Sequence, residues 1–164
     1  MLSEFDGQKR KNNIEENQYV VFVVFDEEFG VDIKQTREII NINELTYIPD
    51  APDFVNGVFN LRGEIVPIID LNKRLFQRED DEHSEHKTII VEMEGNLIGM
   101  QVRDVKGIIR LNEEDIGKAP KITRSINKDY ISGVGKLENR LLVLLNLRRV
   151  LSVEEIGKLN ELEM

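Results

Sequence analysis

The sequence predicts an all-β fold made of two small barrels in tandem, and three observations support this prediction. From Gln18 onward, short runs rich in β-branched residues are separated by turn residues, as in a meandering β protein. Similar runs recur later in the chain, so one structural unit is used twice. The chain of 164 residues is 40% hydrophobic, which is enough for one sizeable core or two small ones.

The expected strands follow one another with short connections. Pro49 and Pro52 end the third strand, and Arg62 with Gly63 closes a hairpin. A helical turn or two is expected at 71–76, a polar charged loop at 77–87 and a closing amphipathic helix at 148–162. The expected strands lie at 19–25, 29–33, 39–48, 58–61, 64–71, 88–93, 97–102, 106–112, 130–137 and 141–147.

The internal repeat is visible when the chain is compared with itself. The segment 29–33 (FGVDI) aligns with 98–102 (IGMQV), and 63–71 (GEIVPIIDL) aligns with 139–147 (NRLLVLLNL). Each half therefore supplies about five strands, which is near the minimum for a small barrel that hides its own edges.

The repeat divides the chain into three parts. Residues 1–17 are predicted to form a disordered tail, 18–87 the first barrel, and 88–164 the second barrel with the closing helix. The apolar runs at 65–69 and 141–145 are continuous rather than alternating, so both faces of these strands should be covered. We therefore expect the barrels to lean on one another, with the closing helix over part of the seam.

The composition argues against several classes of function. There are 31 acidic against 22 basic residues, a formal net charge of -9, and 6% aromatic residues with no tryptophan. A small β-barrel nucleic-acid-binding module, one alternative, needs a basic groove with stacking aromatics, so it is disfavoured. The absence of cysteine suits a reducing cytoplasm, and no apolar run suggests direct membrane insertion.

No catalytic residue, metal site or cofactor site is predicted. The chain has no phosphate-binding glycine loop, and acidic pairs such as Asp26 with Glu27 lie at expected turns beside water. His83 and His86 stand among acidic residues, which leaves a metal-assisted hydrolase as a second alternative. Their segment is the most polar loop of the chain and offers no rigid scaffold for metal ligands, so a solvated loop is favoured.

One short motif suggests a binding role. Asn60-Leu61-Arg62-Gly63 forms the tip of the first hairpin, and the second hairpin carries Glu138 where Arg62 stands. The repeated fold therefore does not require an arginine at this position. An arginine beside a glycine turn can hold a partner's carboxylate at two points, whereas the structural alternative is a salt bridge, for instance to Glu38.

At these residues the chain resembles the CheW coupling proteins of bacterial chemotaxis. The stretch G-V-F-N-L-R-G-E-I-V-P-I-I-D-L, from Gly57 to Leu71, carries the most recognisable motif of that family, and the similarity extends from Gln18 to Leu151. The resemblance implies a pair of SH3-like five-stranded barrels. It also implies a cytoplasmic adaptor without enzymatic activity or cofactor, recruited to membrane receptor arrays, where it bridges a chemoreceptor's cytoplasmic tip and the regulatory domain of the histidine kinase CheA.

The resemblance assigns two sets of contact residues. At the kinase-binding surface, Thr36 stands where the family usually has an aliphatic residue, which predicts a weaker or shifted apolar contact. The implied kinase-binding residues are Val20, Ile33 and Thr36, and the implied receptor-binding residues are Glu38, Gly57, Asn60, Leu61, Arg62, Ile98, Val105 and Ile108.

Overall fold

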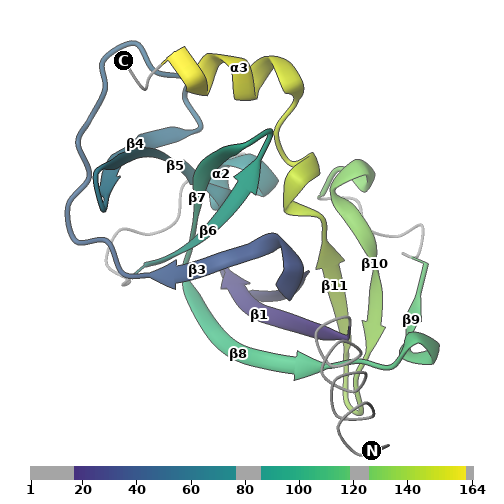
Figure 1. Cartoon of the computed structure of the whole chain (residues 1–164). Helices are drawn as coiled ribbons and strands as arrows, with labels where there is room; N and C mark the ends of the chain where they lie inside the picture. The colour runs from purple at the N-terminus through teal and green to yellow at the C-terminus, as the bar shows by residue number, and fades with distance from the viewer. Residues whose placement is uncertain (1–16, 77–85, 119–125, 162–164) are drawn as a thin grey trace, which may run out of the picture.

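The computed structural model describes residues 17–76, 86–118 and 126–161, and strands dominate in them (Figure 1). The predicted all-β fold with few helices is confirmed. Most of the predicted tail and of the polar loop lies outside the described residues. The elements are β1 Gln18–Val24, β2 Glu27–Asp32, β3 Thr36–Ile40, β4 Val55–Leu61, β5 Glu64–Asp70, α2 Leu71–Phe76, β6 Lys87–Met93, β7 Asn96–Val102, β8 Asp104–Arg110, β9 Ile116–Gly117, β10 Ile131–Lys136, β11 Leu141–Leu145 and α3 Val153–Glu161.

The third strand differs from its prediction at 39–48. β3 ends at Ile40, and the chain continues as a loop in which Ile42 and Leu45 pack against a buried apolar cluster. Thr46 forms an isolated bridge with Val58 of β4, through backbone hydrogen bonds of 3.0 and 2.9 Å. The residues after Ile40 are therefore apolar because their side chains are packed against the cluster, although the backbone there is a loop and not a strand.

The closing helix also begins later than predicted. A short 3-10 turn covers Leu147–Arg149, and α3 starts at Val153 rather than at residue 148. The Ser152 Oγ accepts a hydrogen bond from the Glu155 backbone N–H at 3.1 Å, and the Glu155 carboxylate accepts one from the Ser152 N–H at 2.8 Å. This reciprocal capping box satisfies two backbone donors and fixes the start of the helix.

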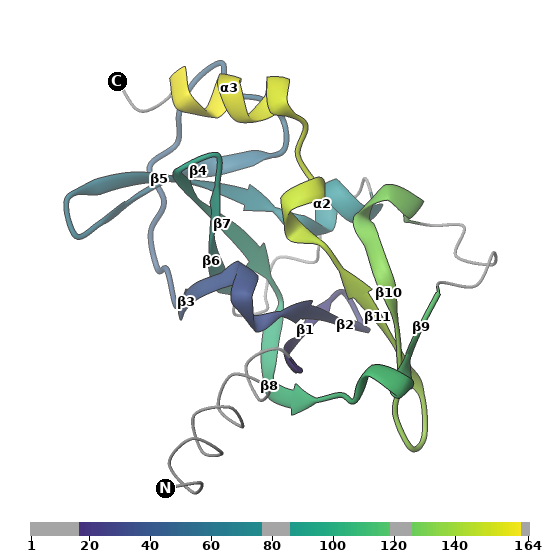
Figure 2. The same cartoon turned by 45° about the vertical axis from the view of Figure 1, so that its right-hand side comes forward.

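Each of the two sheets combines strands from both halves of the chain (Figure 2). In the first sheet, of order β8-β1-β2-β11-β10-β9, the hairpin β1–β2 of the first half lies between strands of the second half. In the second sheet, of order β3-β6-β7-β5-β4, the hairpin β6–β7 of the second half lies between strands of the first. The halves thus exchange their first hairpins, and the sheets do not follow the boundary between residues 87 and 88.

The exchange follows the same register in both sheets. β2 pairs in parallel with β11 so that Gly30 faces Leu144, and β7 pairs in parallel with β5 so that Gly99 faces Ile68. A Cβ atom at Gly30 would lie 2.8 Å from the Leu144 side chain, and one at Gly99 would lie 2.5 Å from that of Ile68. Each glycine therefore makes room for a branched side chain of the exchanged partner strand.

Three apolar clusters fill the part of the molecule that the structure describes. The largest joins the two sheets and includes Phe22, Phe29, Ile89 and Met100. Two smaller clusters each lie within one sheet, one with Leu142 and Leu144, the other with Val66 and Ile68. Within β5 and β11, neighbouring side chains enter a small cluster and the large one in turn, so both faces of these strands are covered over most of the apolar runs. Leu141, at the start of β11, is the exception and is 60% exposed. The contact between the two sheets is therefore formed by the large apolar cluster.

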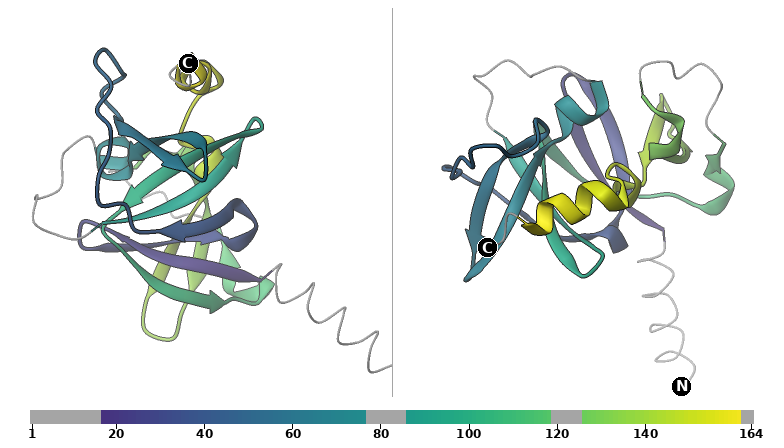
Figure 3. Two further views of the ribbon diagram at one scale, coloured as in Figure 1. Left: turned by 60° about the vertical axis from the view of Figure 1, so that its left-hand side comes forward. Right: turned by 90° about the horizontal axis from the view of Figure 1, so that it is seen from above.

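An arginine of α2 ties the end of the first half to the closing helix. The Arg74 guanidinium donates two hydrogen bonds of 2.7 Å to the Glu155 carboxylate and one of 2.6 Å to the Val150 carbonyl oxygen. It also lies over the rings of Phe54 and Tyr130, 5.4 and 5.9 Å from their centroids. Figure 3 shows α3 crossing the molecule from the side of β10 and β11 toward β4 and β5.

The environment of Glu155 lowers the pKa of its carboxyl group. Burial alone would raise this pKa, but the hydrogen bond from the Ser152 backbone and the contacts with Arg74 outweigh it. Glu155 therefore takes part both in the capping box and in the ion pair with Arg74, which we call the Arg74–Glu155 clamp. The folded chain favours the charged form of its carboxyl group.

Because each sheet needs a hairpin from the other half, we expect neither half to fold alone. Residues 1–87 and 88–164, produced separately, should lack cooperative thermal unfolding, and mixing them should restore a folded complex with a single transition. Circular dichroism during heating, together with size-exclusion chromatography, measures both properties. A cooperative transition of either fragment by itself would show that one sheet is stable without the exchanged hairpin.

Replacing Glu155 with glutamine should lower the free energy of unfolding near neutral pH by about 1–3 kcal/mol, since Arg74 loses a charged partner. The folded pKa lies below the ordinary value of 4.5, so this contribution is present above that value and is lost as the pH falls through the folded pKa. Urea unfolding at about pH 7 and about pH 3 should therefore show a difference that shrinks in acid. The neighbouring exposed Glu154→Gln is the matched control, and an identical pH dependence for both variants would contradict the clamp.

Candidate functional site

The turn between β4 and β5 holds an arginine in an uncommon backbone conformation. Arg62 and Gly63 form a two-residue turn with φ angles of 52° and 89°, both in the left-handed region. The Asn60 Oδ1 accepts a hydrogen bond from the Gly63 N–H at 2.8 Å, which fixes the turn. Asparagine or glycine suits the first turn position better, since a larger residue costs about 1 kcal/mol there. The backbone conformation at position 62 therefore gives no reason for an arginine at this turn.

Arg62 forms a two-point ion pair with Glu38 of β3. Its Nη1 and Nη2 atoms donate hydrogen bonds of 3.2 and 2.6 Å to the two carboxylate oxygens. These bonds lower the pKa of Glu38 below its ordinary value, and the charge of Arg37 lowers it further. The structural alternative for Arg62 is thus observed, yet its side chain is 69% exposed, and exposed ion pairs of this kind add little to the stability of a fold.

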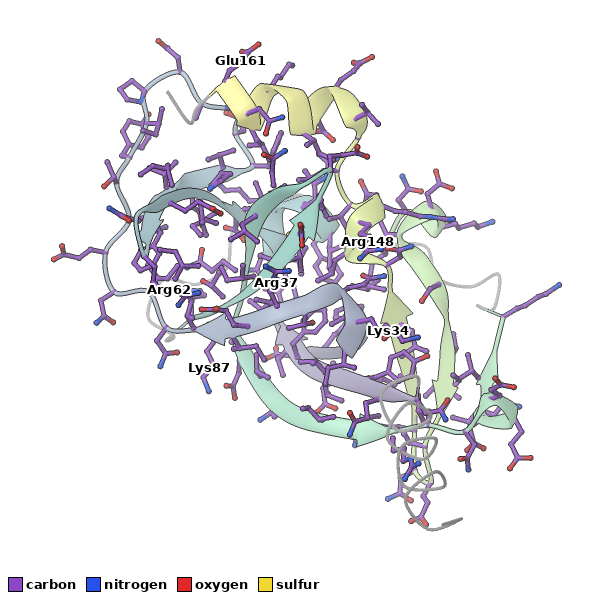
Figure 4. All side chains as sticks on the ribbon, viewed as in Figure 1. Lys34, Arg37, Arg62, Lys87, Arg148 and Glu161 are labelled. Carbon is purple, nitrogen blue, oxygen red and sulfur yellow. The ribbon has the colours of Figure 1, made fainter. Side chains whose placement is uncertain are left out.

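Two further charges extend this pair along β3. Arg37 donates a hydrogen bond of 2.9 Å to Glu92 of β6, and the partly exposed Ile39 follows on the same strand. We call Arg37, Glu38, Arg62 and Glu92 the β3 charge cluster; Figure 4 shows Arg62 and Arg37 beside this strand. Neither Arg37 nor Glu92 was among the residues predicted for the receptor site, although Arg37 stands directly before Glu38 in the sequence.

The remaining first-half residues of the predicted receptor site support the hairpin from inside. Leu61 is 8% exposed and packs with Val66 and Ile68. Gly57 is buried, and a Cβ atom there would lie 2.7 Å from the Thr46 carbonyl oxygen. Both residues therefore shape the site without offering it an exposed side chain.

The predicted second-half residues lie apart from the hairpin tip. Ile98 is 1% exposed and belongs to the large core, so in this structure its side chain is not part of an exposed apolar lining. Val105 is half-buried against the same core, whereas Ile108 is 54% exposed. Both are on β8, an edge strand of the other sheet. Ile39 and Ile108 thus occupy equivalent edge strands in the two halves.

The predicted kinase-binding residues differ in burial. Val20 is 1% exposed and points into the large core, so it cannot present apolar surface directly. Ile33 is half-buried in the 3-10 turn before β3. Thr36 is half-buried, and its Oγ1 atom is buried with no hydrogen-bond partner among the described residues. The available surface thus centres on Ile33 and Thr36, and Val20 belongs to the core cluster against which Ile33 packs.

An open groove of about 1200 Å³ lies where the two sheets meet. Its walls come from the turn after β1 and the start of β8 on one side, and from the loop after β3 and the start of β6 on the other. We call it the inter-sheet groove. The lining combines apolar side chains with charged ones. The apolar ones include Val23, Phe25, Ile42 and Leu45, and the charged ones are Asp26, Glu28, Lys87, Arg103, Asp104 and Lys106.

Within the described ranges, no three or more histidine, aspartate or glutamate side chains gather in a way that could hold a metal ion. The hydrolase alternative depended on His83, which lies outside the described residues, and on His86. None of the helices in the described part of the chain has the length and apolar character needed to cross a membrane.

A family model described as the CheW-like domain matches residues 18–155. The chain belongs to the CheW family. It is 36% identical over 141 residues to a chemotaxis protein CheW of Klebsiella aerogenes, covering 85% of this chain and 84% of that protein. A chemotaxis protein CheW of Treponema pallidum is 33% identical over 154 residues, covering 92% and 91% of the two chains.

A solved structure supports the same assignment. The crystal structure of the scaffolding protein TtCheW from Thermoanaerobacter tengcongensis matches with a TM-score of 0.76 at 31% sequence identity, covering 85% of this chain and 90% of that chain. The two sheets described above are therefore the CheW family fold. The sequence resemblance that started from the first hairpin is confirmed over most of the chain.

Proposed function

We propose that this protein is a non-enzymatic signalling adaptor that couples chemoreceptors to the histidine kinase CheA. The observation that carries the proposal is Arg62, an exposed arginine kept in a left-handed turn where it adds little to stability. The relatives named chemotaxis protein CheW and the scaffolding protein TtCheW support the same function. The adaptor would work in the cytoplasm, at membrane receptor arrays.

The receptor contact would use the β3 charge cluster and the exposed apolar residue Ile108. Asn60 fixes the turn, and Arg62 then presents a planar guanidinium whose two-point geometry suits a carboxylate or a pair of carbonyl oxygens. In the absence of a partner, the Glu38 carboxylate accepts both of these hydrogen bonds from Arg62. Because their ion pair is exposed, a partner can compete for the arginine at small cost.

The kinase contact would use the surface around Ile33 and Thr36. Ile33 lies in the 3-10 turn that joins β2 to β3, so it is carried between strands of the two different sheets. Such a rigid, partly apolar surface suits the regulatory domain of CheA, with Val20 as its buried support.

Arg62→Ala should separate binding from stability. We expect a melting temperature within a few degrees of the unaltered chain, since an exposed ion pair is lost and a strained turn position remains. Receptor binding should weaken at least about tenfold, because truncating a central interface arginine costs about 2 kcal/mol or more. Calorimetry of heating and titration with a receptor cytoplasmic fragment measure the two quantities.

Two companion variants sharpen this test. Glu38→Lys should give a similar binding defect, because it breaks the same charge cluster. Glu138→Ala changes the exposed counterpart of Arg62 in the second hairpin and should leave receptor binding unchanged. A large loss of stability in Arg62→Ala with normal receptor affinity would make Arg62 a structural residue and contradict the assignment.

Ile33→Asp should weaken binding of the CheA regulatory domain while receptor binding stays largely intact. Thr36→Val should not weaken kinase binding and should not lower stability, since it replaces a buried hydroxyl that has no described partner. Val153→Asp, at an exposed apolar residue of α3, is the matched control for the added charge. Pull-down with each purified partner provides the measurement, and equal loss of both partners by a folded Ile33→Asp would place the kinase contact elsewhere.

A further inference from the structure

Three short 3-10 turns, contributed by both halves of the chain, are joined to one another by hydrogen bonds. They are Ile33–Gln35 before β3, Lys128–Tyr130 before β10 and Leu147–Arg149 after β11. The Gln35 Nε2 donates a hydrogen bond of 3.0 Å to the Asn146 Oδ1, and the Gln35 Oε1 accepts one of 2.9 Å from the Leu147 N–H. The Tyr130 carbonyl oxygen accepts a hydrogen bond of 2.8 Å from the Asn146 N–H. The turn after β11 is therefore held against the other two.

These turns bring together exposed cations that are far apart in the sequence. We call Lys34, Lys128, Arg148 and Arg149 the basic patch; Figure 4 shows Lys34 and Arg148 near one another. The turns contain one carboxylate, that of the exposed Asp129, and Asp32 stands directly before the first turn, where it accepts a hydrogen bond of 2.9 Å from the Lys34 N–H. Four cations thus face two carboxylates, a surplus of two positive charges in a chain of net charge -9.

The cations of the basic patch are not used by the fold. None of the four forms an ion pair with another residue that the structure describes. Arg148 lines a small hollow together with Glu92 and Glu94 of the β6–β7 hairpin, but Glu92 already accepts a hydrogen bond from Arg37. Even with Glu94 added, the surface keeps a positive surplus. A carboxylate from outside can therefore pair with these cations without breaking an existing ion pair.

The basic patch is continuous with the apolar surface around Ile33 and Thr36. Lys34 and Gln35 lie in the same 3-10 turn as Ile33, and Thr36 is the first residue of the strand that follows. Apolar contact supplies affinity in an interface, and charges at its rim supply specificity and speed association with a partner of opposite charge. A chain of strongly negative net charge repels acidic surfaces in general. A local positive surplus therefore matters most where an acidic surface has to dock.

We infer that the basic patch binds an acidic surface of the kinase regulatory domain, beside the apolar contact at Ile33. The inference rests on the proposed function, because it takes CheA as the partner. It adds residues of the second half to a contact that the sequence placed on the first half alone, and it names the charge that the partner presents. Gln35 is a positioning residue in this contact, since it holds the turn with Lys34 against the turn with Arg148.

This arrangement predicts effects of opposite sign from neighbouring residues. Lys34→Glu and Arg148→Glu should each weaken binding of the regulatory domain about fivefold or more, because each replaces a cation of the patch with a carboxylate. Asp129→Asn should strengthen binding about twofold, because it removes the one carboxylate that the turns contain. The backbone N–H of residue 129 can still donate its hydrogen bond of 3.0 Å to the Asn127 Oδ1, so the turn is preserved.

The test is titration of the purified regulatory domain of CheA from the same bacterium with each full-length variant, at about 0.1 M and about 0.5 M salt. Lys136→Glu is the matched control, since it makes the same charge change at an exposed lysine at the far end of β10 from the turn Lys128–Tyr130. Lys34→Gln and Arg148→Gln guard against misfolding, and melting temperatures are measured for every variant. The effects at Lys34 and Arg148 should diminish at the higher salt concentration, as expected for exposed charges.

The outcomes separate the inference from the proposed function. If the unaltered chain does not bind the regulatory domain, both are overturned. If it binds, and Ile33→Asp weakens binding while the folded Lys34 and Arg148 variants behave like Lys136→Glu, the function stands and the inference is overturned. Sedimentation with phosphatidylglycerol vesicles tests an anionic membrane as the occupant. Vesicle binding that Arg148→Glu abolishes, with kinase affinity unchanged, would assign the patch to a membrane surface and also overturn the inference.

Discussion

Each half of the chain gives its first hairpin to the sheet of the other half, and this exchange decides how both sheets are built. β1 and β2 complete the sheet of the second half, and β6 and β7 complete the sheet of the first. The exchange requires two parallel contacts at the same register, and Gly30 and Gly99 leave the space for Leu144 and Ile68 there. The large core between the sheets forms from the strands brought together in this way.

A protein that works by contact alone depends on the placement of its surfaces. The exchanged hairpins fix one sheet relative to the other, and the Arg74–Glu155 clamp fixes α3 against α2. The 3-10 turn with Ile33 and the walls of the inter-sheet groove both lie between strands of different sheets. Their geometry therefore exists before any partner arrives, and preorganisation of this kind reduces the entropy lost on binding.

The repeat separates residues that build the fold from those that distinguish its two halves. Both β3 and β8 contain a bulge at the same point of the repeat, and the bulged residues are Arg37 and Lys106. Each is in an ion pair, Arg37 with Glu92 and Lys106 with Asp104. The bulge in the backbone is common to both halves, whereas the ion pairs formed by the bulged residues differ. The two hairpin tips, with Arg62 and Glu138, show the same division.

The sequence alone determined the β class, the repeat and the hairpin motif, because strand propensity, turn residues and self-similarity are local properties. It also pointed to Arg62, since a repeat reveals which position differs between copies. The exchange of hairpins, the burial of Val20 and Ile98, and the Arg74–Glu155 pair, 81 residues apart in the chain, were decided by the tertiary structure. An apolar run indicates that a strand is buried on both faces, but it does not indicate which strands pack against it, because that depends on contacts between residues far apart in the chain.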